Sequence, residues 1–180
     1  MDFDLPEDLR MLKKTVADFV DRELIPVEHK TMEGSRMRPD MRAQLERKAK
    51  DLGLWLLEVP VEYGGQGLGL LGMAVVWEEL ARTIALPPRG PLIFGPDIRP
   101  VLFTLSDAQK EKYLFPVLRG EKVTAFAQSE PDAGSDPGAM RTTAVRNGNR
   151  YVINGYKRWI TNAGDADFFQ LVAATDRVSG

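Results

Sequence analysis

Residues 123–136 read Val123-Thr-Ala-Phe-Ala-Gln-Ser-Glu-Pro-Asp-Ala-Gly-Ser-Asp136, and the expected secondary structure of the chain changes within them. Residues 123–128 alternate in side-chain type with a period of two, which is the pattern of a β-strand. The run from Glu130-Pro131 to Asp136 is a small, polar loop that contains a glycine. Such a loop can bring backbone N–H groups and a hydroxyl close to a phosphate, because no large side chain stands in the way.

A second informative stretch, Trp159-Ile-Thr-Asn162, ends another expected strand. An indole can lie against a flat heterocycle, and a threonine hydroxyl can donate a hydrogen bond to a ring nitrogen. Together the two stretches predict a site for a planar cofactor that carries a pyrophosphate.

The residues before this change are expected to be helical. Apolar side chains recur every three or four residues from Glu7 to about Glu28, where Pro26 should bend or end the helix. A second helix should open at Pro39 and stop at Gly53. Its apolar stripe consists of Met41, Leu45, Ala49 and Leu52.

Two further helices follow. Residues 70–86 are apolar almost all round, so we expect them to form the buried central member of a bundle, ended by Pro87-Pro88. A last helix should begin after a Ser106 cap and end before Gly120.

Further strands are expected after residue 136. Asn147-Gly148 and Asn154-Gly155 are dipeptides that favour hairpin turns. The strands around and after them are expected at 142–146, 151–153, 156–161 and 168–174. These elements predict an antiparallel meander.

The order of elements indicates the α+β fold class. We expect an N-terminal all-helical domain, residues 1–121, followed by an antiparallel β domain, residues 122–180. The meander ends without closing, as a truncated domain would.

Composition excludes several classes of function. The net charge of −2 and the pI of about 5.6 give no basic surface that would recommend nucleic acid as a partner. The absence of cysteine removes disulfides and thiolate chemistry. The acidic N-terminus lacks the features of a signal peptide, and no run reaches the roughly 18 apolar residues of a membrane span. We therefore expect a cytoplasmic protein.

The single histidine, His29, is expected to face solvent at the end of a helix. A lone histidine has no second metal ligand and no triad to join, which argues against zinc sites and histidine-based hydrolases.

The run Gly67-Leu-Gly-Leu-Leu-Gly72 matches the glycine pattern of dinucleotide-binding folds. That fold needs a second strand after the helix, with an acidic residue at its end, and none follows here. Pro60 also suits a central parallel strand poorly. We therefore favour turn-forming glycines between helices.

The chain resembles the acyl-CoA dehydrogenase family over nearly its whole length. The resemblance rests on Val59-Pro-Val-Glu-Tyr-Gly-Gly-Gln-Gly-Leu-Gly69, on the helix around Gln109-Lys-Glu-Lys-Tyr-Leu114 that leads to Gly120-Glu121, and on the two stretches above. It implies an N-terminal helical domain, a middle β domain and a C-terminal four-helix domain around one FAD. The C-terminal helical domain is absent from these 180 residues.

The resemblance also implies residue roles. Phe126, Gln128 and Ser129 would lie along the flavin edge. Gly134 and Ser135 would meet phosphate, with Ser135 also near the pantetheine or phosphates of the CoA thioester and so a substrate-binding residue.

In the second stretch, Trp159 would cover the isoalloxazine and Thr161 would hydrogen-bond near flavin N5, with Ile160 between them in the same cofactor-binding run. Glu130 and Asp136 are expected to be structural, bonding loop N–H groups.

The implied reaction is α,β-dehydrogenation of an acyl-CoA: a carboxylate removes the α proton while hydride leaves the β carbon for flavin N5. An electron-transfer flavoprotein is the expected electron acceptor, and the complete protein is expected to form a homo-oligomer or a mixed oligomer. The base would belong to the absent domain, so this chain contains no catalytic residue of its own and is expected to be inactive alone.

Alternatives stay open at this point. The chain could be a non-catalytic or subunit-like module that binds acyl-CoA or flavin and pairs with another chain. Acyl-CoA oxidases and nitroalkane oxidase-like proteins share the implied fold. The prolines at 91, 96 and 100 do not suit one regular helix in the segment that would line the acyl cavity, so the acyl chain length cannot be assigned.

Overall fold

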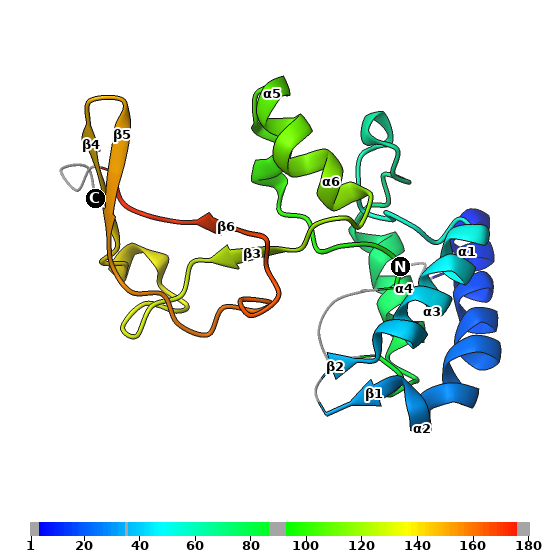
Figure 1. The fold of residues 1–180 in the computed structure, drawn as a ribbon. Helices are drawn as coiled ribbons and strands as arrows, with labels where there is room; N and C mark the ends of the chain where they lie inside the picture. Colours follow the sequence, from blue (N-terminus) through cyan, green and yellow to red (C-terminus); the bar gives the residue numbers. More distant parts are fainter. Residues whose placement is uncertain (1–3, 35, 87–92, 176–180) are drawn as a thin grey trace. The chain divides into compact units, whose positions relative to one another are not determined.

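The computed structural model describes residues 4–34, 36–86 and 93–175, and Figure 1 shows the course of the chain. The chain divides into two compact units, Met1–Asp97 and Ile98–Gly180. The domain boundary expected between residues 121 and 122 is at a different position from this division, and it stays a prediction.

The first unit is mainly helical, as predicted. Its helical elements are α1 (Glu7–Phe19), a π-helical turn (Val20–Leu24), a 3₁₀ turn (Ile25–Val27), α2 (Glu28–Thr31), α3 (Pro39–Asp51), a 3₁₀ turn (Val61–Tyr63) and α4 (Leu70–Leu80). Pro26 lies in the 3₁₀ turn, where the regular helix is interrupted. A small antiparallel hairpin that the sequence did not predict, β1 (Met32–Glu33) with β2 (Arg36–Met37), stands between α2 and α3.

The predicted second helix is confirmed in α3. It begins at Pro39, whose fixed φ suits the first helical turn, and it ends two residues before Gly53. Met41, Leu45 and Ala49 are buried, whereas Leu52 is exposed just after the helix. The apolar stripe is therefore one residue shorter than predicted.

The helix α4 is shorter and less enclosed than predicted. It ends at Leu80, not at residue 86, and α1 packs against it. Val76 and Leu80 are buried, but Leu70 is 90% exposed and Trp77 is also exposed. The expectation of burial on all sides is wrong, because only one face of this apolar helix finds partners within the unit. The core comprises Val16, Phe19, Val20, Leu24, Met37, Leu45, Ala49, Leu54, Leu57, Met73, Val76, Leu80, Ala85, Ile93 and Phe94.

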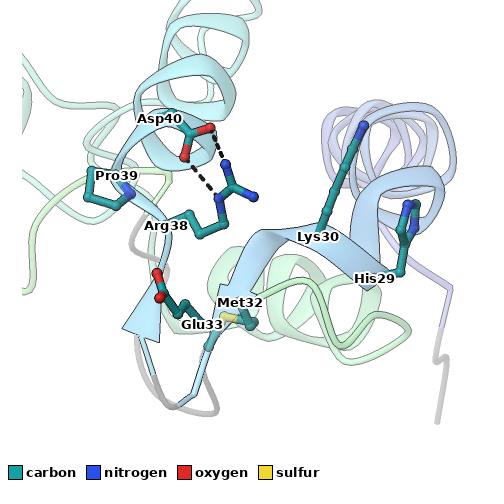
Figure 2. A pocket seen from close by; sticks show the side chains of 7 residues that line it. All are labelled: His29, Lys30, Met32, Glu33, Arg38, Pro39 and Asp40. Atoms are coloured by element: carbon teal, nitrogen blue, oxygen red, sulfur yellow. Dashed lines mark hydrogen bonds and ion pairs between the residues drawn. The ribbon is translucent and has the colours of Figure 1, made fainter.

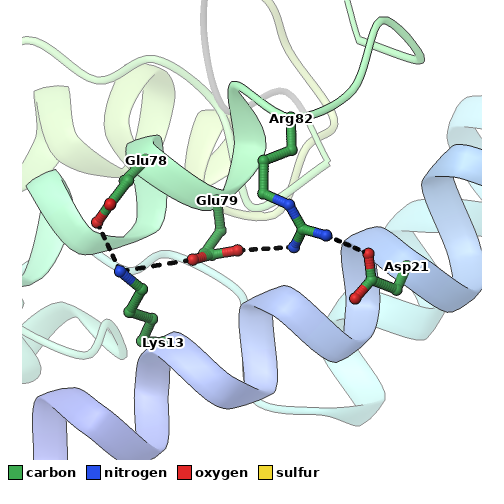
Figure 3. Close-up of polar contacts among 5 residues, drawn as sticks. All are labelled: Lys13, Asp21, Glu78, Glu79 and Arg82. Carbon is green, nitrogen blue, oxygen red and sulfur yellow. Dashed lines mark hydrogen bonds and ion pairs between the residues drawn. The ribbon is translucent and has the colours of Figure 1, made fainter.

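A network of charged side chains connects α4, and the residues just after it, to α1 and to the π-helical turn that follows α1 (Figure 3). Lys13 donates to Glu78 at 2.8 Å, and Arg82 donates to Glu79 at 2.8 Å and also pairs with Asp21. Glu79 is buried, and its partners Arg82 and Lys13, the latter at 3.7 Å, offset the cost of removing its carboxylate from water.

The glycines near residues 64–67 are turn formers, as predicted. A Cβ at Gly65 would lie 2.0 Å from the Val59 carbonyl oxygen, so only glycine fits there. No strand precedes these glycines within residues 54–60, and Pro60 lies in a loop. The dinucleotide-binding fold is therefore excluded.

The second unit combines a helical segment with two pairs of strands. Its elements are a 3₁₀ helix (Pro100–Thr104), α5 (Asp107–Gln109), a π-helical turn (Lys110–Leu114), α6 (Phe115–Leu118), β3 (Thr124–Ala127), a 3₁₀ turn (Pro137–Ala139), β4 (Thr143–Asn147), β5 (Arg150–Asn154) and β6 (Phe168–Leu171). The Ser106 backbone N–H donates to Gln109 Oε1 at 3.1 Å, which confirms the predicted cap. The segment expected to line the acyl cavity, with its prolines at 91, 96 and 100, comprises residues 90–103. Residues 90–92 lie outside the described residues, and residues 93–99 contain no α-helix before the 3₁₀ helix.

The strands do not form the predicted meander. β4 and β5 form the antiparallel hairpin expected at Asn147-Gly148, with Val145 opposite Val152. β6 instead pairs with β3 in parallel, from Thr124 beside Phe168 to Ala127 beside Leu171. The α+β class is confirmed, but the antiparallel prediction is wrong for this pair. A period of two identifies a strand without identifying its partner or direction, and the long connection between β3 and β6 permits a parallel return.

The predicted second hairpin at Asn154-Gly155 does not form. Residues 155–167 contain no strand, so the strand expected at 156–161 is wrong, and of the strand expected at 168–174 only Phe168–Leu171 is regular. A Cβ at Gly155 would lie 2.2 Å from Thr142 Oγ1, so this glycine permits a close approach between two segments instead of forming a turn.

None of the helices in residues 4–34, 36–86 and 93–175 combines the length and apolar character that a bilayer span requires.

Candidate functional site

The structure joins the two stretches from which a cofactor site was predicted. The Arg158 backbone N–H donates to the Ser129 carbonyl at 2.9 Å. Ser129 lies two residues after the end of β3, and Arg158 immediately precedes Trp159. Residues that are about 30 positions apart in the sequence are therefore adjacent in the second unit.

A buried ion pair stands beside this backbone bond. Lys157 Nζ donates to Glu130 Oε1 at 2.8 Å, and the two side chains are only 9% and 5% exposed. Lys157 Nζ also donates to the Gln128 carbonyl at 2.9 Å. Sequence reasoning missed Lys157, because a single lysine in an expected strand carries no signal of burial.

Glu130 is structural, as expected from the sequence. Its carboxylate accepts hydrogen bonds from the backbone N–H groups of Arg141 at 2.6 Å and Thr142 at 3.0 Å. Burial alone raises the pKa of Glu130, but the hydrogen bonds from Lys157 and from these N–H groups outweigh it and lower the pKa to about 2. A carboxylate with so low a pKa is a weak base at neutral pH. The second expected structural acid, Asp136, accepts from the Gly138 N–H at 2.9 Å.

The prediction that the stretch from Trp159 ends a strand is wrong. Trp159 lies in a series of turns. Its φ is +60°, its side chain is 77% exposed, and the Arg158 guanidinium lies 4.3 Å from the centre of its ring. Positive φ is uncommon for a bulky residue and costs about 1–3 kcal/mol, so it persists only where the surroundings enforce it. Such outliers cluster at functional sites, and this one presents an indole to solvent.

The turns continue through the rest of this stretch. The Ala163 N–H donates to the Ile160 carbonyl at 3.2 Å, and Asn162 also has a positive φ, of 65°. Ile160 is half-buried and Thr161 is exposed. The Thr161 side chain is therefore accessible to a ligand.

The loop after Glu130 leaves open space beside its backbone. Glu130 and Ala133 close a tight turn through mutual backbone hydrogen bonds of 2.8 and 3.3 Å. A Cβ at Gly134 would meet nothing within 4 Å, and Gly134 does not have a positive φ. Neither packing nor backbone conformation therefore requires glycine here. Together with the exposed Ser135, this arrangement suits a ligand such as a phosphate that needs close access to the backbone.

The remaining predicted residues lie at the end of β3. Phe126, Gln128 and Ser129 are all half-buried. The Arg99 guanidinium lies 5.2 Å from the centre of the Phe126 ring, which adds a cation beside this strand. Hydrogen bonds connect Gln128 to Lys157 and Ser129 to Arg158, so the two predicted stretches lie next to each other at these residues. The contacts of the predicted residues with a cofactor stay predictions.

A separate hollow in the first unit contains none of the predicted site residues (Figure 2). Its lining residues are His29, Lys30, Met32, Glu33, Arg38, Pro39 and Asp40. Arg38 is already paired with Asp40 through hydrogen bonds of 3.2 and 2.9 Å. His29 is exposed, as expected, and no group of three or more potential metal ligands occurs among residues 4–34, 36–86 and 93–175.

Comparison with known protein families gives matches over both units. Residues 6–121 match the family model described as "Acyl-CoA dehydrogenase, N-terminal domain", and residues 125–179 match the one described as "Acyl-CoA dehydrogenase, middle domain".

Individual relatives agree with these matches. The human mitochondrial short-chain specific acyl-CoA dehydrogenase is 38% identical over 179 residues, which cover 97% of this chain and 42% of that protein. A solved structure of the electron transferring flavoprotein of Acidaminococcus fermentans contains a chain with 32% identity and a TM-score of 0.70, matched over 98% of this chain and 46% of that one. Glutaryl-CoA dehydrogenase from Mycobacterium smegmatis in complex with FADH2 matches with 28% identity and a TM-score of 0.72, over 96% and 44% of the two chains. The chain spans less than half the length of these relatives.

Proposed function

The chain belongs to the acyl-CoA dehydrogenase family, and from this premise we propose that it supplies part of the FAD site of an enzyme that dehydrogenates the α,β bond of an acyl-CoA thioester. The observation that carries the proposal is the hydrogen bond between the Arg158 N–H and the Ser129 carbonyl, which joins the two stretches expected to hold the flavin. The complex of a similar glutaryl-CoA dehydrogenase with FADH2 supports the choice of cofactor.

The first stretch would bind the edge and the phosphates of the cofactor. Phe126, Gln128 and Ser129 would lie along the isoalloxazine edge, with the Ser129 hydroxyl available to its pyrimidine side. Gly134 and Ser135 would meet the pyrophosphate, where the open space beside Gly134 leaves room for it. Ser135 would also approach the CoA part of the substrate.

The second stretch would cover the ring. The exposed indole of Trp159 would lie against the isoalloxazine, and the accessible Thr161 hydroxyl would donate a hydrogen bond near N5. Ile160, between them, would belong to the same cofactor-binding run. A bound flavin would supply the redox chemistry by taking up hydride from the β carbon of the substrate. A donor near the accepting atom would favour the reduced, electron-rich ring.

The proton chemistry requires a base that Glu130 does not provide. Its pKa of about 2 and its three hydrogen-bond donors make it a poor proton acceptor. The family resemblance assigns the base to a C-terminal helical domain. We therefore expect the 180-residue chain alone to be inactive, and turnover of any acyl-CoA by the purified chain would contradict this part of the proposal.

The proposed partners follow from the same family. Acyl-CoA would be the substrate, and an electron-transfer flavoprotein would reoxidise the flavin; the similarity to a chain in the flavoprotein structure from Acidaminococcus fermentans agrees with such an association. The complete protein would form a homo-oligomer or a mixed oligomer.

A second candidate function is a non-catalytic, subunit-like module that binds flavin or acyl-CoA and pairs with another chain. The unsuitability of Glu130 as a base favours it, since Glu130 is the carboxylate that pairs with Lys157, next to the Arg158–Trp159 turn. Purification together with a related full-length chain would support this function. An oxidase-like relative would be recognised by rapid reoxidation of the reduced flavin by oxygen.

The experiment that tests the proposal compares the FAD affinity of two tryptophan variants. Trp159→Ala should weaken binding by about 5- to 150-fold, which corresponds to the roughly 1–3 kcal/mol of one aromatic stacking contact. Trp77→Ala, which removes another exposed tryptophan, in α4, is the matched control and should leave the affinity unchanged. Equal affinities for the two variants would contradict the assigned role of Trp159.

A further inference from the structure

Lys157 is the point at which three segments of the second unit meet. Its ammonium group donates to the Gln128 carbonyl at 2.9 Å, to Glu130 Oε1 at 2.8 Å and to Met140 Sδ at 3.0 Å. A lysine ammonium has three N–H donors, so this set of acceptors uses its full capacity. The side chain is only 9% exposed, so the charge is largely shielded from bulk water.

Glu130 extends the same junction. Its Oε1 also accepts from the Thr142 N–H, and its Oε2 accepts from the Arg141 N–H. The pair therefore connects the end of β3, the segment before β4 and the residues that lead into Trp159. No side chain of this pair is among those expected to contact the cofactor.

This junction is better suited to fixing geometry than to adding stability. The desolvation cost of a buried ion pair commonly cancels its attraction, and apolar replacements are often neutral for stability. By contrast, three directed hydrogen bonds from one ammonium group fix the position of residue 157 relative to the Gln128 carbonyl and to the side chains of Glu130 and Met140. The adjacent bond from the Arg158 N–H to the Ser129 carbonyl depends on that position.

The conformation of Trp159 gives an independent reason to expect that neighbouring residues hold its backbone in place. Its φ of +60° is unfavourable for a bulky side chain, and the indole itself is 77% exposed, so little packing of its own holds it there. The backbone must therefore be held by its neighbours, and Lys157 and Arg158 are the residues that immediately precede it.

We propose that Lys157 is a positioning residue of the flavin site, which holds the Trp159–Thr161 turn against Gln128 and Ser129, the two residues that follow β3, through its three hydrogen bonds. The proposal rests on the proposed function for its effect on FAD, but the placement of Trp159 can be measured without any flavin. Lys157 acts through other residues and touches no reacting atom.

The test uses Lys157→Met in the full chain, in a background where Trp55 and Trp77 are replaced by phenylalanine so that Trp159 is the only tryptophan. The first readout is the quenching of Trp159 emission by acrylamide in the flavin-free protein, and the second is the dissociation constant for FAD. Lys122→Met is the matched control, because Lys122 lies in the same unit and its ammonium group donates at an exposed position, to the Lys112 carbonyl at 3.4 Å.

We expect Lys157→Met to change the quenching of Trp159 and to weaken FAD binding by about 10- to 100-fold, the range found at metal sites when residues that orient the metal ligands are removed. Lys122→Met should change neither. Unchanged quenching and unchanged affinity in a folded Lys157→Met variant would overturn the proposal. A role confined to stability would lower the urea midpoint and leave both readouts of the folded protein unaltered, which would also overturn it.

Two complications have defined outcomes. If Lys157→Met does not fold, Lys157→Arg replaces it in the test. Arginine keeps the charge opposite Glu130 but cannot reproduce the three-way geometry of the ammonium group. This variant should fold and bind FAD several-fold more weakly, and an affinity equal to that of the unsubstituted chain would overturn the proposal. If the unsubstituted chain binds no FAD, the proposed function fails for this chain, and the quenching of Trp159 alone decides on Lys157.

Discussion

Replacing Gly155 by alanine tests the close approach that assembles the site. The new Cβ would lie 2.2 Å from Thr142 Oγ1 and 2.6 Å from Thr142 Cα, and contacts under about 3 Å require a shift. The atoms in the way belong to or adjoin the backbone, and Thr142 is almost completely buried, so no flexible side-chain end can move aside. Overpacking of this kind costs about 1–3 kcal/mol.

The substitution should therefore lower the urea midpoint by roughly 1 M, given a dependence of about 1–3 kcal/mol per molar urea for a small protein. The assay is urea unfolding followed by Trp159 emission, with Trp55 and Trp77 replaced by phenylalanine. Gly155→Ala should also displace Lys157 from Glu130 and weaken FAD binding, since residue 157 is two positions further on. Midpoints that agree within error for Gly155→Ala and the parent chain would refute the packing of Gly155 on Thr142.

Three further predictions concern other residues. Gly134→Ala should leave the urea midpoint unchanged or slightly raised, because the new Cβ meets nothing within 4 Å. It should weaken FAD binding if the phosphate lies there, and an affinity equal to that of the parent chain would argue against a phosphate contact. The pKa of Glu130 is lowered from 4.5 to about 2. Its contribution to stability should therefore be complete above about pH 5 and disappear as the pH falls toward 2. In acid unfolding titrations, Glu130→Gln should reduce the loss of stability over this pH range. Arg82→Met should lower the urea midpoint of the first unit, because the buried Glu79 loses a donor, whereas Lys14→Met, at an exposed pair, should lower it less. Equal effects of the two would contradict a stabilising role of the Arg82–Glu79 pair.

The helical half of the fold could be predicted because its signals are local. Pro39 and Ser106 begin helices for reasons contained within four residues, and the burial of Met41, Leu45 and Ala49 follows from their spacing. The extent of burial of α4 could not be predicted in the same way. Its composition is apolar on every side, and which side is covered depends on the neighbours available within the unit.

The strand half shows where local patterns fail. Asn147-Gly148 predicted its hairpin correctly, because the turn and both strands are consecutive. Asn154-Gly155 carries the same signal, but Gly155 serves to pack on Thr142, which no local pattern reveals. The parallel pairing of β3 with β6 depends on residues more than 40 positions apart.

The candidate site was predicted as two separate stretches, and the structure adds what joins them. The structural role of Glu130 was expected, but its partner Lys157 was missed, since burial of a lone lysine depends on acceptors distant in the sequence. The aromatic and β-branched residues around Trp159 predict a strand end, whereas the structure has a turn there; the positive φ has no signature in the residue types.

The most direct test of the central claim, that the two stretches form one flavin site, is a titration of FAD into the chain that retains Trp159 as its only tryptophan. The account predicts saturable quenching of Trp159 emission, with the same dissociation constant as the change in the visible flavin spectrum. Flavin that binds without quenching Trp159, or a chain that shows no saturable change at all, would contradict it.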